Sequence, residues 1–186
     1  MDDPAVVRVV ELIDSGDVDV RRQGLELLHA LDHAQRCAAV QSARRLRRAG
    51  LQGLDLRGLD LRAWGLRTAC PRGRDLRRID LSGSDLSGAD LSGANLHHAR
   101  LRGTILRGSR LERCTLQLAD LSGADLREAS LVGASLVGAS LRRADLRGAR
   151  LPERLWGVDL TAADLRGLDL SGHDVDPAVL AQARRG

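Results

Sequence analysis

The stretch ADLSG at residues 89–93 and the stretch ADLRE at residues 124–128 are two copies of a five-residue unit that recurs through most of this chain of 186 residues. From residue 51 to residue 151, every fifth position gives 21 positions, of which 20 are Leu and one is Pro71. A small or apolar residue, most often Ala, stands two places before the central Leu. Asp, Asn or Ser usually stands directly before it, and Gly often stands two places after it. The unit therefore reads A-[DNS]-L-x-G.

A period of five matches neither an α-helix at 3.6 residues per turn nor a flat strand at two. The chain must therefore turn once per unit, and four such corners close a square coil whose neighbours stack at about 4.8 Å. We expect the central Leu to form a ladder in the core, Ala to fill the cramped place beside it, and Gly to serve the turn. The predicted core ladder includes Leu81, Leu86, Leu91, Leu96, Leu101, Leu121, Leu126, Leu131, Leu141 and Leu146.

The unit resembles the repeat of the pentapeptide-repeat family, whose members fold as right-handed quadrilateral parallel β-helices. The resemblance covers about residues 49–175 and implies an all-β solenoid of about six coils. The family's usual mixture of Leu and Phe at the central position is absent, because this chain contains no Phe. We therefore expect a narrow and uniform core.

Two irregularities interrupt the repeat. Pro71 occupies a ladder position and Arg74 a small-residue position, so we expect this corner to loop out, because a charge cannot lie unpaired in such a core. After Leu151 the ladder restarts one residue early at Leu155. Either one repeat has four residues, or the segment bulges outward. The bulge, with Trp156 packing over the coil edge, is the interpretation we favour at this point.

The first and last coils of a stacked rod expose unpaired backbone groups, so we expect capping segments at both ends. Residues 1–48 are predicted to be helical, with Asp3 as N-cap and Pro4 in the first turn. Residues 13–28 resemble helical-hairpin repeats of the HEAT type, so this segment is either a cap or a docking module. At the other end, residues 176–186 are predicted to form a capping helix, from residue 178 to residue 185. Val179 and Leu180 suggest the hypothesis of a homodimer through this end.

The composition narrows the classes of function. The formal net charge is +4, with eight acidic and eight basic residues up to residue 48 and 17 acidic against 21 basic after it. This excess of positive charge is smaller than that expected of a protein dedicated to binding nucleic acid. Cys37, Cys70 and Cys114 lack metal-site spacing and indicate reduced thiols, so we expect a cytoplasmic protein. The first residues show no signal-peptide pattern, and the chain has no stretch long enough to predict a membrane span.

The sequence contains no catalytic constellation, and we predict no enzyme activity, cofactor or metal. The repeated Asp residues are explained by hydrogen bonds to turn backbone, and His97 and His98 are expected to face solvent. Counted in steps of 20, several Arg residues share a face and could form a basic stripe for phosphates or an acidic partner. The alternative is pairing of these Arg residues with Asp85, Asp125 and Asp145. The candidate stripe comprises Arg67, Arg107, Arg127 and Arg147, with Arg62, Arg102 and Arg142 on the neighbouring face.

We therefore predict a non-enzymatic scaffold that binds an unidentified protein through the flat faces of the rod. The family resemblance implies an alternative, because some members bind DNA gyrase or topoisomerase IV and protect it from quinolones by imitating DNA. The excess of Arg argues against that role, since a DNA mimic should be acidic. Weak binding of nucleic acid or an acidic partner through the Arg stripe is a second alternative. The scarcity of aromatic residues disfavours nucleic acid, and no membrane contact is predicted.

Overall fold

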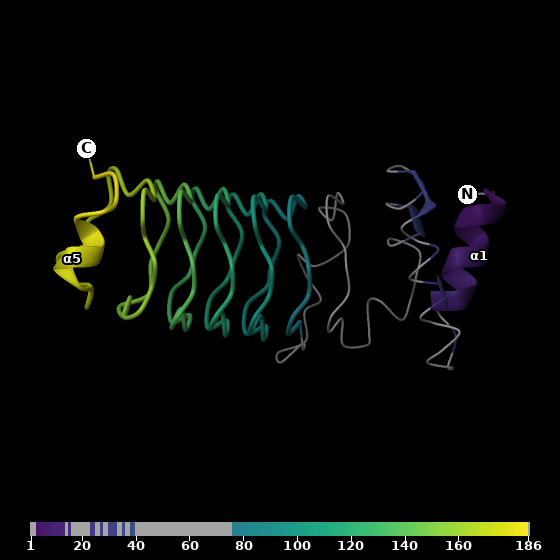
Figure 1. The fold of residues 1–186 in the computed structure, drawn as a ribbon, viewed down its shortest axis with the longest axis horizontal. Coiled ribbons are helices and arrows are strands. Elements are labelled where there is room, and N and C mark those ends of the chain that lie inside the picture. The colour runs from purple at the N-terminus through teal and green to yellow at the C-terminus, as the bar shows by residue number, and fades with distance from the viewer. Residues whose placement is uncertain are drawn as a thin grey trace.

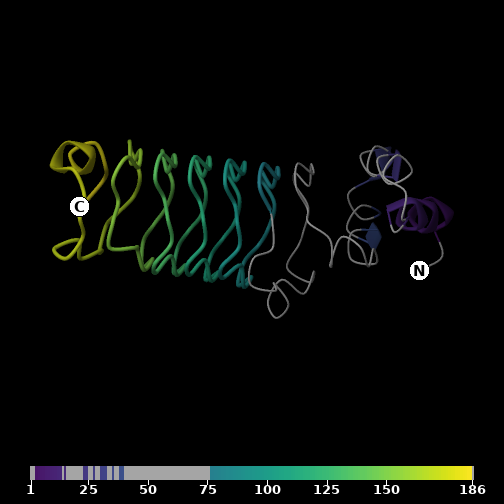
Figure 2. The ribbon, with the colours of Figure 1, turned by 90° about the horizontal axis from the view of Figure 1, so that it is seen from below.

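The computed structural model describes residues 3–13 and 15, the positions 23, 24, 27, 30–32, 35, 38 and 39, and every residue from 76 to 185. Helix α1 spans Pro4–Ile13 and helix α5 spans Pro177–Leu180. Between residues 76 and 174 the backbone is a succession of turns joined by isolated parallel β-bridges. Figures 1 and 2 show these turns as coils stacked along one axis, with α5 at the end of the stack.

Most of the described pentapeptides, from residue 76 to residue 168, fold as one type II β-turn. In the repeat that begins at Leu86, the amide of Ala89 donates to the carbonyl of Leu86 at 3.0 Å, and Gly88 has a φ of +65°. A type II turn requires a positive φ at its third residue, which explains the frequent Gly at that position. Non-glycine residues there adopt the same conformation, as at Glu128 with a φ of 61°.

The coils are joined by parallel backbone hydrogen bonds. Residue 80 bridges to residue 100 and residue 100 bridges to residue 120, so one coil contains 20 residues, or four pentapeptides. The amide of Leu81 donates to the carbonyl of Arg100 at 2.8 Å, and the amide of Arg100 donates to the carbonyl of Ile79 at 2.8 Å. Every coil is thus paired with the next through its backbone.

The solenoid has four walls, which we number by their ladder positions. The residue before each ladder position and the two residues after it face outward. Wall 1 has ladder positions 81, 101, 121, 141 and 160; wall 2 has 86, 106, 126, 146 and 165; wall 3 has 91, 111, 131, 151 and 170; wall 4 has 76, 96, 116, 136, 155 and 175.

The Leu ladder fills the core. All the ladder residues predicted above are buried, and so is every other ladder Leu from 76 to 165. The small positions are buried beside them; Cys114 occupies one of these, and its thiol lies 2.8 Å from the carbonyl of Leu91. Thr104 occupies another, and its hydroxyl donates to the carbonyl of Leu81 at 2.8 Å. The inward placement of Leu, Ala and Cys114 is confirmed.

The Asp that precedes each ladder Leu stabilises the turn. The carboxylate of Asp90 accepts a hydrogen bond from the amide of Ser92 at 3.0 Å, and Asn95 accepts one from the amide of His97 at 3.2 Å. The same bond recurs from Ser82 to Asp80 and from Thr161 to Asp159. The structural explanation of the repeated Asp residues is therefore confirmed.

The register break after Leu151 is a four-residue repeat, and the bulge favoured above is wrong. Bridges change from a spacing of 20 residues, as in 130 to 150, to a spacing of 19, as in 140 to 159. Leu151, Pro152 and Leu155 are all buried, so the coil shortens without leaving the ladder. Trp156 is 58% exposed and does not cover the coil edge. A shortened coil keeps both Leu residues in the core, which a bulge would not.

The C-terminal helix is shorter than predicted, because it ends at Leu180. Asp176 caps it by accepting a hydrogen bond from the amide of Ala178 at 2.8 Å. The chain then returns to the solenoid, where the carbonyl of Arg184 accepts a hydrogen bond from the amide of Leu165 at 2.8 Å. Residues 181–184 therefore pair with the last rung rather than extend the helix.

At the N-terminal end, α1 begins at Pro4 as predicted, and Asp3 accepts a hydrogen bond from the amide of Ala5 at 2.9 Å. Asp32 and Gln35 exchange backbone-to-side-chain hydrogen bonds of 3.1 and 2.8 Å, which is a capping box. Residues 49–75 lie outside the described residues, so the loop predicted at Pro71 and Arg74 and the first of the predicted coils are not described.

We predict that Leu126→Ala lowers the free energy of unfolding by about 2–5 kcal/mol, because it leaves a cavity in a fully buried ladder position. The control is Leu118→Ala, at a side chain that is 50% exposed, which should change stability by less than about 1 kcal/mol. Urea unfolding followed by circular dichroism measures both. An equal decrease in the free energy of unfolding for the two variants would contradict the inward placement of the ladder Leu residues.

Candidate interaction surface

Arg107, Arg127 and Arg147 of the predicted basic stripe lie on wall 2, where together with Arg166 they form a ladder of ion pairs. A nitrogen of the Arg147 guanidinium lies 2.7 Å from an oxygen of Asp145, and Arg166 lies 2.7 Å from Asp164. Arg147 also lies 3.8 Å from Asp164 in the next coil. A column of Asp and a column of Arg thus run side by side along this wall, with ion pairs both within a coil and between neighbouring coils.

The other members of the stripe follow the same pattern. Arg107 pairs with Glu128 at 2.9 Å, and Arg127 pairs with Asp125 in its own coil and with Asp145 at 3.8 Å. On wall 1, Arg102 lies 3.5 Å from Asp120 and Arg142 lies 3.2 Å from Asp159. Arg62 and Arg67 lie outside the described residues. Every described Arg of the candidate stripe therefore has a carboxylate partner.

These pairs lower the pKa of the carboxyl groups on wall 2. Hydrogen bonds from Arg166 are the largest cause that lowers the pKa of Asp164, to about 2. Hydrogen bonds from Arg127 and Arg147 likewise lower the pKa of Asp125 and of Asp145. The wall is a neutralised surface at neutral pH, and its Arg residues are not a free basic patch.

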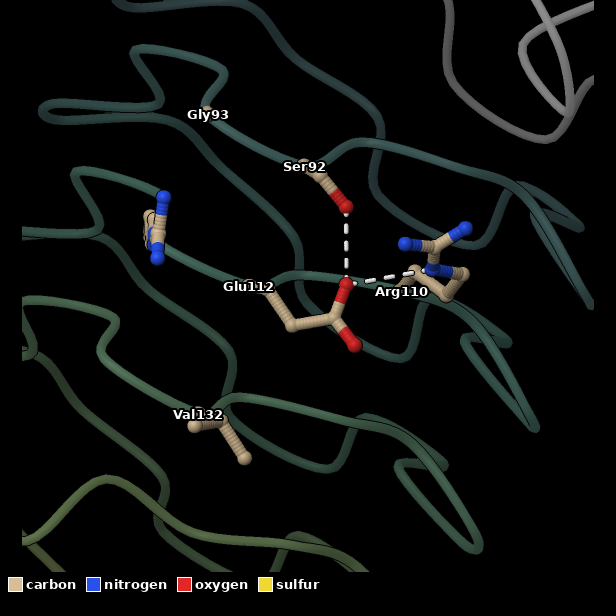
Figure 3. A pocket seen from close by; sticks show the side chains of 6 residues that line it. Ser92, Gly93, Arg110, Glu112 and Val132 are labelled. Carbon is tan, nitrogen blue, oxygen red and sulfur yellow. Dashed lines mark hydrogen bonds and ion pairs between the residues drawn. The ribbon is translucent and has the colours of Figure 1, made fainter.

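Wall 3 carries a shallow hollow of about 490 Å³ lined by six residues, shown in Figure 3. There the hydroxyl of Ser92 donates to Glu112 at 2.9 Å, and Nε of Arg110 donates to the same carboxylate oxygen at 3.1 Å. Burial raises the pKa of Glu112, but the net pKa is lowered, with the hydrogen bonds from Ser92 and Arg110 acting against burial. A carboxylate with a lowered pKa is a poor general base, so this arrangement does not activate Ser92 as a nucleophile.

The His and Cys residues do not assemble a metal site in the described part of the chain, where no group of three or more His, Cys, Asp or Glu side chains converges. The rings of His97 and His98 lie edge to face at 4.4 Å on wall 4. Cys114 is buried as a free thiol. None of the helices described is long and apolar enough to cross a membrane.

Wall 4 differs from the others, and sequence reasoning missed it. Walls 1 and 2 carry an Asp, Glu or Arg in every described coil, whereas the outward positions of wall 4 from residue 95 to residue 138 carry none. Leu118, Val137 and Trp156 lie on three successive coils of this wall and are 50%, 58% and 58% exposed. We call these three residues the apolar strip. Val137 and Trp156 each directly follow a ladder Leu and are 19 residues apart across the register break, whereas Leu118 stands two residues after its ladder Leu, in the neighbouring column. Examining all outward positions of one wall together would have found the strip.

Comparison with known proteins identifies the repeat. A family model for pentapeptide repeats matches residues 75–113 and 119–152 in eight copies. A pentapeptide repeat protein from the thylakoid lumen of Arabidopsis thaliana is 33% identical over 52% of this chain and 68% of its own, with a TM-score of 0.50. The chain belongs to the pentapeptide-repeat family. The solenoid is accordingly a right-handed β-helix.

Other pentapeptide-repeat structures are similar to this one at lower TM-scores. A protein from the cyanobacterium Cyanothece is 30% identical over 59% of this chain and 82% of its own, with a TM-score of 0.44. QnrB1, a plasmid-mediated fluoroquinolone resistance protein, is 18% identical over 73% of this chain and 92% of its own, with a TM-score of 0.31. A search of curated proteins found no match.

The ion pairs of wall 2 predict a pH dependence of stability. The folded-state pKa of Asp164, about 2, lies below its ordinary value of 3.8. The stabilisation from this pair is therefore present above pH 3.8 and is lost as the pH falls toward 2. We expect Asp164→Asn, which can keep the turn hydrogen bond as Asn95 does, to lower the urea midpoint at pH 6 and to converge on the wild type near pH 2.

Arg166→Gln removes the other partner and should give the same convergence, measured by urea unfolding at a series of pH values. A deficit that stays constant between pH 6 and pH 2 would show that the ion pair does not supply the stabilisation.

Proposed function

We propose that this pentapeptide-repeat protein is a non-enzymatic scaffold that binds another protein through wall 4. The observation that carries the proposal is the apolar strip on a wall whose central coils have no charged side chain. Exposed apolar patches mark interaction sites, and interface centres are depleted of charge and enriched in aromatic residues. Trp156 provides the kind of aromatic anchor that dominates binding energy.

The backbone supports this role because it holds the strip in a fixed geometry. On wall 4 the coils of Leu118 and Val137 are paired by their backbones, through the bond of 3.0 Å from the amide of Leu118 to the carbonyl of Val137. The backbone of the next coil lies close by, since a β-carbon built on Gly157 would be 3.6 Å from the amide of Gly138. Leu118 and Val137 are thus presented from hydrogen-bonded coils and Trp156 from the coil beside them, and we expect little backbone ordering on binding.

The other walls are less suited to apolar contact. Covering wall 2 would remove water from the paired carboxylates Asp125, Asp145 and Asp164 and from their Arg partners. Such desolvation offsets much of the attraction that a new partner could supply. Covering wall 4 between residues 95 and 138 would desolvate no Asp, Glu or Arg side chain.

Two alternatives rank lower. Topoisomerase binding by DNA mimicry requires an acidic surface, but residues 76–185 contain 16 Arg and 14 acidic residues. Binding of nucleic acid through the Arg stripe is disfavoured by the pairing of its described members with carboxylates. It is also disfavoured by the scarcity of aromatic residues for base stacking, since Trp64 and Trp156 are the chain's two Trp residues and it has no Phe or Tyr.

The division of the chain and its location belong to the same proposal. We infer that residues 1–48 form a helical cap on a solenoid of about six coils over residues 49–175, as the repeat spacing implies. The pairing of residues 181–184 with the last rung supports a covering role for the C-terminal segment. A cytoplasmic location remains a prediction from the unpatterned cysteines.

The test uses two matched substitutions. Val137 and Val132 follow ladder Leu residues in adjacent repeats and are 58% and 41% exposed, but Val137 lies on wall 4 and Val132 on wall 3. The immobilised full chain, Val137→Asp and Val132→Asp are compared for proteins captured from extracts of the source cells after cross-linking. We expect partners captured by the wild type to be retained by Val132→Asp and lost from Val137→Asp.

Thermal unfolding confirms that both variants are folded before capture is compared. Retention of the same partners by Val137→Asp, or their loss only from Val132→Asp, would place the binding surface on another wall.

A further inference from the structure

We propose that wall 4 binds a second copy of this chain, packed face to face with the two solenoids antiparallel. This inference rests on the proposed function, since it names the occupant of the wall assigned there to protein binding. The order of the charged residues along wall 4 supports this arrangement.

The charges of wall 4 are segregated by sign at its two described ends. Arg77 and Arg78 lie on the first described coil, and Asp174 and Asp176 follow on the last. Arg78, Asp174 and Asp176 are exposed. Between these ends, the only Arg, Asp or Glu at an outward position is Arg154, which bridges to Asp174, and Asp75 lies outside the described residues. The two described ends of the wall therefore carry two Arg and two Asp respectively. The outward positions from residue 95 to residue 138 carry no Asp, Glu or Arg, and Leu118 and Val137 are exposed there among polar side chains.

This pattern is complementary to itself when one copy is reversed. A two-fold axis that crosses the wall at right angles to the rod brings the basic end of one copy against the acidic end of the other, twice in each dimer. A two-fold axis parallel to the rod would instead oppose Arg77 and Arg78 to the same residues of the second copy. Charge therefore selects the antiparallel arrangement over the parallel one.

The antiparallel arrangement also brings the apolar strips of the two copies together. With the axis between the coils of Leu116 and Leu136, Leu118 and Val137 of both copies meet at the centre. Trp156 of each copy then faces His97 of the other, which gives the exposed histidine pair of wall 4 a contact. A heterologous partner would need to carry the same unusual order of charges in reverse, whereas a second copy carries it already.

The expected dimer is small and reversible. Six ladder positions at a spacing of about 4.8 Å give a wall of about 24 Å between its end coils. An interface of this length lies at the low end of specific interfaces. We therefore expect the dimer to dissociate on dilution.

Sedimentation velocity of the full chain over a range of concentrations tests the occupant. We expect a monomer–dimer equilibrium whose dissociation constant is raised about tenfold or more by Val137→Asp, because a charge is buried at the centre of the interface. The control Val132→Asp should leave it unchanged. A wild-type chain that stays monomeric throughout, or a dimer that is insensitive to Val137→Asp, overturns the proposal.

Two charge-reversal variants test the antiparallel arrangement. The variant Arg77→Asp with Arg78→Asp has two acidic ends. The variant Asp174→Arg with Asp176→Ser has two basic ends, and Ser can cap α5 in place of Asp. We expect each alone to dimerise more weakly at low salt than the wild type, and an equimolar mixture to recover the wild-type association. Failure of the mixture to recover, or no weakening of either variant alone, overturns the arrangement.

The outcomes separate this inference from the proposed function. A wild-type chain that is monomeric at every concentration, but loses its captured partners in Val137→Asp, refutes the second copy and leaves wall 4 as a surface for another protein. A dimer that is weakened by Val137→Asp, with no other partner captured, supports the second copy as the occupant.

Discussion

The type II turn that recurs in the pentapeptides from residue 76 to residue 168 is the constraint on which the rest of the structure depends. Each turn places its ladder Leu and the following small residue inside, so two of five positions belong to the core and three face outward. Backbone pairing then stacks equivalent positions of successive coils at about 4.8 Å. Outward side chains are therefore ordered in columns. These columns are the surface of the described solenoid that we propose a partner contacts.

The close spacing of coils makes electrostatics decisive on the walls. Like charges stacked at this spacing repel one another, and wall 2 offsets this repulsion by placing its Asp and Arg columns side by side. Arg127, for example, pairs with Asp125 in its own coil and with Asp145 in the next. Wall 4 avoids the repulsion in another way, because its outward positions from residue 95 to residue 138 carry no Asp, Glu or Arg. The same rod thus has one wall of paired charges and one wall without Asp, Glu or Arg in its central coils, and the second is the wall that we propose is buried against a protein.

Much of this structure is predictable from the sequence, because the period of five determines which residues face inward. The ladder, the inward Cys114 and the Asp-stabilised turns all follow from position in the repeat. The register break after Leu151 is where prediction from the repeat fails. The sequence allows either a four-residue repeat or an outward bulge, and it leads us to favour the bulge because a bulge would let Trp156 pack over the coil edge. The structure instead keeps Leu155 in the core. Once the four-residue repeat is recognised, Trp156 falls at an outward position beside Val137.

The pairing of the Arg residues could not be predicted from spacing alone. Whether Arg107 reaches Glu128 or stays free depends on side-chain conformation and not on the repeat, and the same holds for Arg102 and Asp120. The apolar strip on wall 4, in contrast, follows from the positions of its residues in the repeat. It is found only when apolar residues at outward positions are examined as well as charged ones.

The most direct test of the central claim, that this protein meets its partners through wall 4, is ¹⁹F NMR of the chain labelled with 5-fluorotryptophan. The chain contains two Trp residues, Trp64 and Trp156, so two resonances are expected, and Trp156→Phe assigns them. The account predicts that the Trp156 resonance shifts as complexes form, because this exposed ring becomes buried. Complex formation that leaves the Trp156 resonance unchanged would contradict the account.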